Sequence, residues 1–465
     1  MADQNRFVPG NTSSRSAPSH PPGPKGISVL AYCLSRQRDP LGDLRKIAVK
    51  YGDIVHMQLG RRHDYLINHP DHIKAILCAP QSEMARSTPP ALKRLLGRGL
   101  LTSQGDYHHR HKRMLAPAFH KEIVRQWNLT ITTHCERLRD RWSEGDEADI
   151  EYEMLRLTLA IVLKALVGAE LEEGTDEMAR AANTLVEMTH CRTLPVIDDL
   201  LDKIALGRIR RFKDASGRFD EIVYRMIRER RDANAPVNDL LSALLRVRDE
   251  ETGCAALCDD EIRDETLTML MAGHETTAHA LTWTWYLLSQ HPHAEQKLHA
   301  ELDTVLQGRM PRIDDLEALP YNRMVFSEAM RLYPPVWIVA RRNPNAWSLG
   351  KFTFPAGSFI FISQYLMQRD ARFFSDPDHF DPERWTPEAA AQRPRYSYFP
   401  FGGGPRQCIG EGFAWAVGLL VLASLSQRWR LSLAPGQRID LEPLITLRPK
   451  YGMRMIVEQH SNRTQ

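Results

Sequence analysis

Residues 399–410 read FPFGGGPRQCIG, a glycine-rich turn that leads into a single cysteine, Cys408. Three consecutive glycines followed by proline free the backbone for a tight turn and for close approach to a flat ligand. An apolar segment of helical character follows, and the N-terminus of a helix carries partial positive charge that favours a thiolate. The stretch therefore predicts that Cys408 is a thiolate ligand of a metal, and not an inert buried cysteine.

The spacing of this loop matches F-x-x-G-x-R-x-C-x-G at every fixed position, and that pattern resembles the haem-binding loop of cytochromes P450. The resemblance implies that Cys408 is the axial ligand of haem b, where a thiolate favours cleavage of the O–O bond of dioxygen. Arg406 would then hold a haem propionate. The remaining cofactor-binding residues implied in the loop are Phe401, Gly402, Gly404 and Gly410.

Residues 272–277, AGHETT, resemble the A/G-G-x-D/E-T-T segment on the long central helix of the same family. Glycine in a helix interior costs about 1 kcal/mol relative to alanine, so Gly273 is expected to serve the cofactor. With a threonine hydroxyl that bonds back to a carbonyl, it is expected to open a local bulge that makes room for dioxygen. The resemblance implies that Thr276 relays a proton through water and that Glu275 is its source.

Two further segments resemble the family in the same chain order. Glu328 and Arg331 form its E-x-x-R pattern, and residues i and i+3 share one face of a helix, so the two can pair. Arg384 lies in PERW, which resembles the family's P-E-R-F segment. The resemblance implies a buried charge triad of these three residues with a structural role.

Residues 105–113, GDYHHRHKR, resemble the helix that holds a haem propionate through W-x-x-x-R in the family. His108 and Lys112 occupy the two positions, and both side chains can donate to a carboxylate, although lysine is a point donor and not a fork. Arg341 aligns with a further propionate-binding position. The alternatives left open are Arg110 and Arg113 for the first pair, and Arg342 for Arg341.

Apolar spacing typical of helices runs from about Asp71 to Leu332, with strand-like segments at Tyr51–Asn68 and Phe352–Ile362. The expected fold is mainly α with small β-sheets: a single large cytochrome P450-like helical domain around a buried haem, spanning residues 25–460. Residues 1–24, rich in serine and proline, are expected to form a disordered tail. The main helices are expected at Glu122–Trp142, Glu151–Leu166, Arg208–Ala233, Asn238–Arg248, Asp259–Ser289 and His293–Leu306.

The composition of the chain limits where the protein is expected to act and what it is expected to bind. The formal net charge of +3 is too small to indicate a nucleic-acid partner. The longest strongly apolar stretch falls short of the roughly 20 residues that a membrane span needs. Seven scattered cysteines argue for a reducing compartment. We expect a cytoplasmic monomer without a membrane anchor.

The resemblance implies a monooxygenase that inserts one oxygen atom from O2 into a lipophilic small molecule, such as a fatty acid, terpenoid or polyketide. The alternatives are a peroxygenase or isomerase of the same fold, and a haem sensor without catalysis. Glu275 and Thr276 favour the use of dioxygen over peroxide. The substrate is expected to contact Ser87–Leu101, Met269–Thr276 and Val336–Val339.

Electrons are expected to come from a separate ferredoxin or flavodoxin with its reductase, because the haem fold uses the whole chain. An acidic partner would dock on a local basic surface by electrostatic steering. The basic residues expected to form that surface are Arg110, Lys112, Arg113, Arg393, Arg395 and Arg406.

Overall fold

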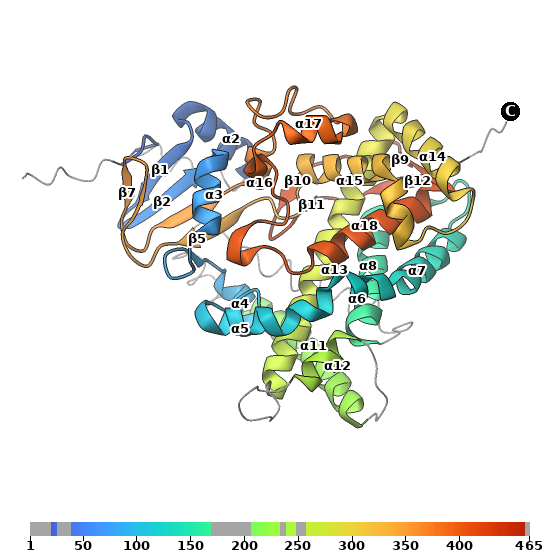
Figure 1. Ribbon diagram of the computed structural model, residues 1–465, viewed down its shortest axis with the longest axis horizontal. Helices are drawn as coiled ribbons and strands as arrows, with labels where there is room; N and C mark the ends of the chain where they lie inside the picture. Colours follow the sequence, from blue (N-terminus) through green and yellow to red (C-terminus); the bar gives the residue numbers. More distant parts are fainter. Residues whose placement is uncertain (1–19, 26–38, 169–205, 233–238, 248–256, 461–465) are drawn as a thin grey trace, which may run out of the picture.

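The computed structural model describes residues 20–25, 39–168, 206–232, 239–247 and 257–460, and helices dominate the fold (Figure 1). Helices gather on one side of the molecule and the largest sheet lies on the other. The helices are α2 (Pro40–Tyr51), α3 (Pro70–Cys78), α4 (Pro90–Leu96), α5 (Gly105–Leu115), α6 (Lys121–Gln126), α7 (Asn128–Arg141), α8 (Ile150–Val167), α11 (Leu206–Asp232), α12 (Leu240–Arg246), α13 (Asp259–Gln290), α14 (Pro292–Leu306), α15 (Pro320–Leu332), α16 (Gln364–Met367), α17 (Pro387–Ala391) and α18 (Glu411–Ser426).

The strands form four small sheets. The largest has the order β1-β2-β8-β5-β3, in which β2 pairs with β8 in parallel and the other neighbours are antiparallel. Its strands are β1 (Ile54–Leu59), β2 (Arg62–Ile67), β3 (Ala85–Arg86), β5 (Val339–Arg342) and β8 (Phe359–Ile362). The other sheets pair β4 (Glu147–Asp149) and β9 (Trp429–Leu433) with β12 (Arg454–Gln459), β6 (Trp347–Leu349) with β7 (Phe352–Phe354), and β10 (Leu441–Pro443) with β11 (Leu447–Pro449).

The core is centred on α13, which packs against α8, α15 and α18. Its two tryptophans, Trp283 and Trp285, are fully buried. The helix α18 is apolar around its whole circumference, as a helix enclosed on every side must be, and most of its residues are buried. The cysteine loop ends where α18 begins, so a rigid buried helix fixes the position of Cys408.

The fold class predicted from the sequence, mainly α with small sheets, is confirmed. The hairpin predicted within Tyr51–Asn68 appears as β1 and β2, and the strand-like stretch Phe352–Ile362 divides into β7 and β8. One helix boundary is wrong. The single helix predicted over Glu122–Trp142 is two helices that meet at Trp127, whose indole is buried against Phe413 of α18.

The predicted disordered tail is wrong at its C-terminal end, since residues 20–24 lie against β1. The backbone N–H of His56 donates to the Pro22 carbonyl at 3.0 Å, and Pro21 and Pro24 are buried. β1 is an edge strand, and the segment supplies an acceptor for one of its otherwise unpaired N–H groups. Residues 1–19 lie outside the described residues.

Within the part of the chain that the structure describes, no helix combines the length and apolar character needed to span a bilayer.

Candidate active site

A cavity of about 2280 Å³ lies between the cysteine loop, α13, the α4 region, β5 and the β10–β11 turn. Pockets for one small ligand usually measure about 300–1,000 Å³, so this cavity has room for a large flat group and a second molecule. The site residues predicted from the sequence that line it are Phe401, Gly402, Arg406, Cys408, Gly410, His108, Lys112, Arg341, Gly273, Glu275 and Thr276.

Gly404 is the one predicted cofactor-binding residue that does not line the cavity. Its backbone has φ +64°, and a Cβ built there would lie 2.0 Å from the carbonyl oxygen of Leu77 at the end of α3. The glycine is therefore needed for close approach of the loop to α3, and its predicted role in binding the cofactor stays a prediction.

Backbone hydrogen bonds fix the cysteine loop. The N–H of Cys408 donates to the Phe401 carbonyl, and the N–H of Gln407 donates to the Gly404 carbonyl, both at 3.0 Å. Gly402 has φ +73°, which a residue with a side chain rarely adopts. The thiol is thus held at one place on the cavity wall.

The Cys408 side chain is accessible from the cavity but is otherwise enclosed by protein. Burial raises the pKa of its thiol, while a backbone hydrogen bond from Gly410 and the charges of Lys112 and Arg86 lower it. The nearby cations therefore offset only part of the cost of burying a thiolate. A metal cation bound from the cavity would stabilise the thiolate further. The donor chemistry fits an iron ligand.

Three arginines from different parts of the chain face the same cavity: Arg86 on β3, Arg341 on β5 and Arg406 in the cysteine loop. Burial, together with the two neighbouring guanidinium groups, lowers the pKa of Arg341 to about 9. Burial also lowers the pKa of Arg86 and that of Arg406 to about 10.

Among the described residues, no carboxylate forms an ion pair with any of these three arginines. Arg406 donates to the carbonyls of Leu100 and Ser103 and to Gln81 Oε1, but its buried Nε has no partner. Buried cations are expected to be paired. The cluster therefore calls for an anion in the cavity, and the two propionates of haem have the right charge.

The two alternative pairs of propionate-binding residues on α5 differ in whether they reach the cavity. His108 and Lys112 line the cavity, whereas Arg110 and Arg113 do not. Burial and the nearby cations Arg406 and Lys112 lower the pKa of His108 to about 3, so its ring is neutral at pH 7. Lys112 Nζ donates to the carbonyls of Pro405 and Gln407, at 2.9 and 3.3 Å, and thereby also holds the cysteine loop. Arg341 is buried, whereas its rival, Arg342, is exposed.

On α13, Gly273 and Thr276 face the cavity, and the Thr276 hydroxyl donates to the Ala272 carbonyl at 2.8 Å. The back-bonded threonine is as the sequence predicted. The predicted bulge is wrong, because the helix is continuous from Asp259 to Gln290. A hydroxyl can share the carbonyl of residue i−4 without displacing the main-chain bond, so the back-bond alone does not break the helix.

Glu275 points to a buried hydrogen-bonded network. Its carboxylate accepts from the Thr446 hydroxyl, whose oxygen lies 3.1 Å from Nδ1 of His279. Nε2 of His279 lies 3.1 Å from the carboxylate of Glu151 at the start of α8. Since the Thr446 hydrogen goes to Glu275, Nδ1 must donate to Thr446, and Nε2 then faces Glu151. The four side chains therefore form a continuous chain of hydrogen bonds from Glu275 on the cavity wall to Glu151.

The buried charge triad predicted from the sequence is confirmed. Glu328 and Arg331 are both 0% exposed and form a bidentate pair at 2.7 and 2.8 Å. Arg384 Nε lies 3.3 Å from the same carboxylate. Trp385 Nε1 also donates to Glu328, and Arg331 donates to three backbone carbonyls of the segment 368–379. The triad thus ties α15 to the irregular chain that precedes the cysteine loop.

The family model described as Cytochrome P450 matches residues 21–454. Cyclooctatin synthase of Streptomyces melanosporofaciens is 37% identical over 441 residues, covering 92% of this chain and 93% of that protein. Cyclooctat-9-en-7-ol 5-monooxygenase of the same organism is 34% identical, with 92% and 94% covered. Pentalenene oxygenase of Streptomyces avermitilis is 30% identical, with 90% and 93% covered.

Solved structures agree on the fold. A retinoic-acid-bound cyanobacterial CYP120A1 superimposes with a TM-score of 0.84 at 24% identity, covering 96% of this chain and all of that one. A cytochrome P450DA heme domain gives a TM-score of 0.82, also at 24% identity, with 96% and 98% covered.

A helical fold around a large cavity, with a cysteine on its wall and an acid–alcohol pair on its central helix, defines a haem-thiolate oxygenase. The chain belongs to the cytochrome P450 family. It is a monooxygenase that inserts one oxygen atom of O2 into a lipophilic small molecule, with electrons from a separate redox partner.

Sequence reasoning missed three residues of the site. Arg86 lies on a two-residue strand with no motif around it, and only the pairing of β3 with β5 brings it beside Arg341. Thr446 lies in the turn between β10 and β11, far along the chain from Glu275. His279 did have a signal, since it lies one helical turn after Glu275 on the same face.

Proposed function

We propose that the cavity binds haem b with Cys408 as the axial ligand, and that the enzyme oxidises a terpenoid. When bound, the haem supplies the iron that activates dioxygen. The observation that carries the proposal is the position of the Cys408 sulfur on the wall of a cavity that also holds three guanidinium groups, one buried and two half-buried, with no ion pair to a carboxylate among the described residues. Thiolate and arginines together match the iron and the propionates of one molecule.

Within this proposal, Arg86, Arg341 and Arg406 bind the propionates. His108 and Lys112 contribute donors from α5, and Lys112 also keeps the loop in place through two carbonyls. Each ion pair formed with a propionate removes the mutual repulsion that lowers the pKa of the arginines. Because no carboxylate of the described residues forms an ion pair with these arginines, their charges remain available for the propionates.

The substrate proposal rests on the cavity and on the relatives. The three segments expected to contact substrate all line the cavity, and their side chains there include Leu96, Leu100, Met269 and Val339. An apolar lining excludes water and favours a hydrocarbon. The names of the relatives describe oxidation of pentalenene and of cyclooctat-9-en-7-ol. A terpenoid is therefore favoured over a fatty acid or a polyketide.

Proton delivery is proposed to run through Glu275 to the cavity. The network of Glu275, Thr446, His279 and Glu151 offers a path of existing hydrogen bonds along which a proton can reach the Glu275 carboxylate. Thr276 presents its hydroxyl oxygen to the cavity while its hydrogen goes to Ala272. That oxygen can accept a hydrogen bond from a water that carries the proton onward.

The proposed redox partner is an acidic ferredoxin or flavodoxin, and the proposed setting is a cytoplasmic monomer. Of the six basic residues predicted to meet the partner, Lys112 and Arg406 face the cavity, and Arg393 donates to the Arg384 carbonyl and stacks on Trp385. The docking surface is therefore proposed to rest on Arg110, Arg113 and Arg395. The proposed surface thus keeps three of the six basic residues that the sequence predicted.

A spectral titration tests the substrate proposal. Polycyclic terpenoid hydrocarbons added to the haem-loaded protein should change its haem spectrum at micromolar concentration, whereas linear fatty acids of equal carbon number should need about tenfold more. Ala272→Phe, which fills the cavity beside Gly273, should abolish the change at normal haem content. Tighter binding of the fatty acids, or an unchanged titration in Ala272→Phe, would contradict the proposal.

A further inference from the structure

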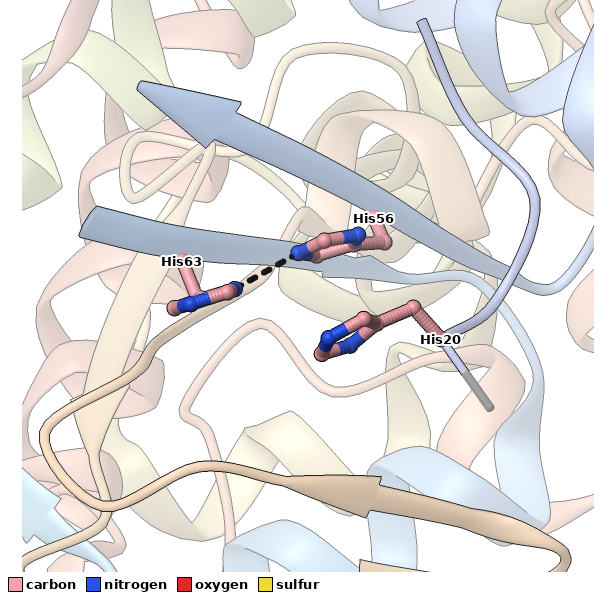
Figure 2. A group of neighbouring side chains, drawn as sticks. All are labelled: His20, His56 and His63. Carbon is pink, nitrogen blue, oxygen red and sulfur yellow. Dashed lines mark hydrogen bonds between the residues drawn. The ribbon is translucent and has the colours of Figure 1, made fainter. Parts of the chain in front are cut away.

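Three histidines meet in the region of the N-terminal hairpin, outside the cavity described above. His56 lies on β1, His63 lies on β2, and His20 lies in the segment before α2 (Figure 2). One nitrogen from each ring can be chosen so that all three atoms lie within 4.8 Å of one another. None of the three lines the cavity.

The sheet register explains the first two members. His56 is directly opposite Tyr65, and His63 is directly opposite Gln58, so both histidines project from the same face of the hairpin as diagonal neighbours. Their rings are nearly parallel, with centroids 5.2 Å apart, and Nε2 of His56 lies 2.9 Å from Nδ1 of His63. Figure 2 shows these two nitrogens directed toward each other.

The third member is brought in by the chain that covers the edge of β1. A Cβ on Gly23 would lie 1.8 Å from the His56 carbonyl oxygen, so only glycine permits this approach. The His20 ring stacks on His56 at 4.3 Å, and its Nδ1 lies 3.0 Å from the Tyr65 hydroxyl. If Nδ1 donates to that hydroxyl, Nε2 keeps its lone pair for a ligand.

The charges around the cluster disfavour protonated histidine. Burial, together with the neighbouring His20, His63 and Lys25, lowers the pKa of His56 to about 4. Burial and His63 also lower the pKa of His20. No carboxylate appears among the described groups that act on either ring. A lowered pKa favours the neutral ring, and neutral imidazole is the form that binds a metal.

We propose that His20, His56 and His63 form a binding site for a divalent zinc ion that ties the N-terminal segment to the β1–β2 hairpin. Three imidazoles with an open fourth position suit zinc, and His20 is exposed, so water can reach that position.

Only a small rearrangement is needed. Zinc at about 2.0–2.1 Å from each nitrogen places two tetrahedral ligands about 3.3 Å apart, slightly more than the present 2.9 Å between His56 and His63. The proton now shared between those rings moves to the other nitrogen of its own ring, so no proton has to leave the protein. His20 must move closer, and residues 20–24 would be held more tightly against β1.

Zinc titration of the haem-loaded full chain, after chelator treatment and buffer exchange, tests the site. We expect one zinc ion per chain by calorimetry, and a rise in the thermal midpoint that grows with free zinc. His20→Ala removes an exposed ligand and should weaken binding by at least about tenfold. His63→Gln should do the same from within the hairpin. His293→Ala, an exposed histidine on α14, is the matched control and should bind as the wild type does.

Hydrogen exchange gives a second readout. Zinc should slow exchange in peptides that cover residues 20–25 and 54–67 in the wild type but not in His20→Ala. The proposal is overturned if no zinc binds at 100-fold excess, or if zinc binds equally to the wild type, His20→Ala and His63→Gln. The last result would place the metal elsewhere, for example on an exposed cysteine such as Cys78.

Discussion

Thr276 and His279 lie three residues apart on α13 but reach different surroundings. The Thr276 oxygen faces the cavity, whereas His279 is 1% exposed, is hydrogen-bonded to Thr446 and has its Nδ1 3.9 Å from the Glu275 carboxylate. In the proposed proton relay, Thr276 would pass a proton on within the cavity, and His279 would only supply or position one. His279 is a positioning residue in this sense, together with Thr446.

Both residues can be tested by how efficiently electrons are used. Thr276→Ala and His279→Gln should keep haem and substrate binding, while product formation falls by on the order of tenfold or more and peroxide rises, because a positioned proton donor is lost. Thr284→Ala removes a similar back-bonded hydroxyl that does not line the cavity, and should leave the product yield unchanged. The measurement is the amount of product formed per NADPH consumed. An unchanged ratio in both variants would contradict the proposed proton relay.

At the scale of elements, the cysteine loop depends on its contact with α3. Gly404→Ala places a side chain at positive φ, which costs about 1–2 kcal/mol, and drives a Cβ against the Leu77 carbonyl. We expect the loop to shift and the purified variant to carry much less haem. Gly412→Ala, in the first turn of α18, meets no atom within 4 Å and should retain full haem content. The ratio of haem absorbance to protein absorbance measures both, and equal ratios would show that the loop tolerates the shift.

The charge triad connects α15 to the irregular chain before the cysteine loop, and its removal should lower the stability of the fold. Glu328→Ala leaves Arg331 buried without its carboxylate, which is expected to destabilise the protein by about 3–5 kcal/mol. Soluble yield should fall sharply, and any recovered protein should unfold at a lower urea concentration. Arg309→Ala breaks an exposed pair with Asp315 and should leave both quantities unchanged. A Glu328→Ala variant with wild-type yield and midpoint would show that the pair is dispensable.

For the molecule as a whole, electron delivery should depend on salt. An acidic partner is steered by surface charge, and a Debye length of about 10 Å at 0.1 M salt falls to about 3 Å at 1 M. Reduction by such a partner should slow markedly over this range, and Arg110→Glu should slow it further at low salt. Arg61→Glu, on the β1–β2 turn, makes the same change in net charge and should not. If the rate of reduction changed neither with salt nor with the Arg110→Glu substitution, the docking surface would have to lie elsewhere.

The sequence predicted those parts of the molecule in which local pattern and chemistry coincide. The loop around Cys408, the pair on α15 and the acid–alcohol pair on α13 each have fixed spacing. The structure places Cys408, Glu275 and Thr276 on the cavity wall and pairs Glu328 with Arg331. Arg86 and Thr446 were not predictable, because only tertiary pairing carries them to the cavity. The packing of residues 20–24 on β1 was missed for a related reason: proline and glycine suggest disorder until an unpaired strand edge is beside them.

The central claim is that Cys408 binds haem iron as a thiolate, and the spectrum of the reduced protein with carbon monoxide tests it most directly. The wild type should show the long-wavelength band typical of thiolate-ligated haem. Cys408→Ala should lose that band and most of its haem, whereas Cys78→Ala, which changes an exposed cysteine outside the cavity, should keep both. The same band at the same intensity in Cys408→Ala would contradict the account.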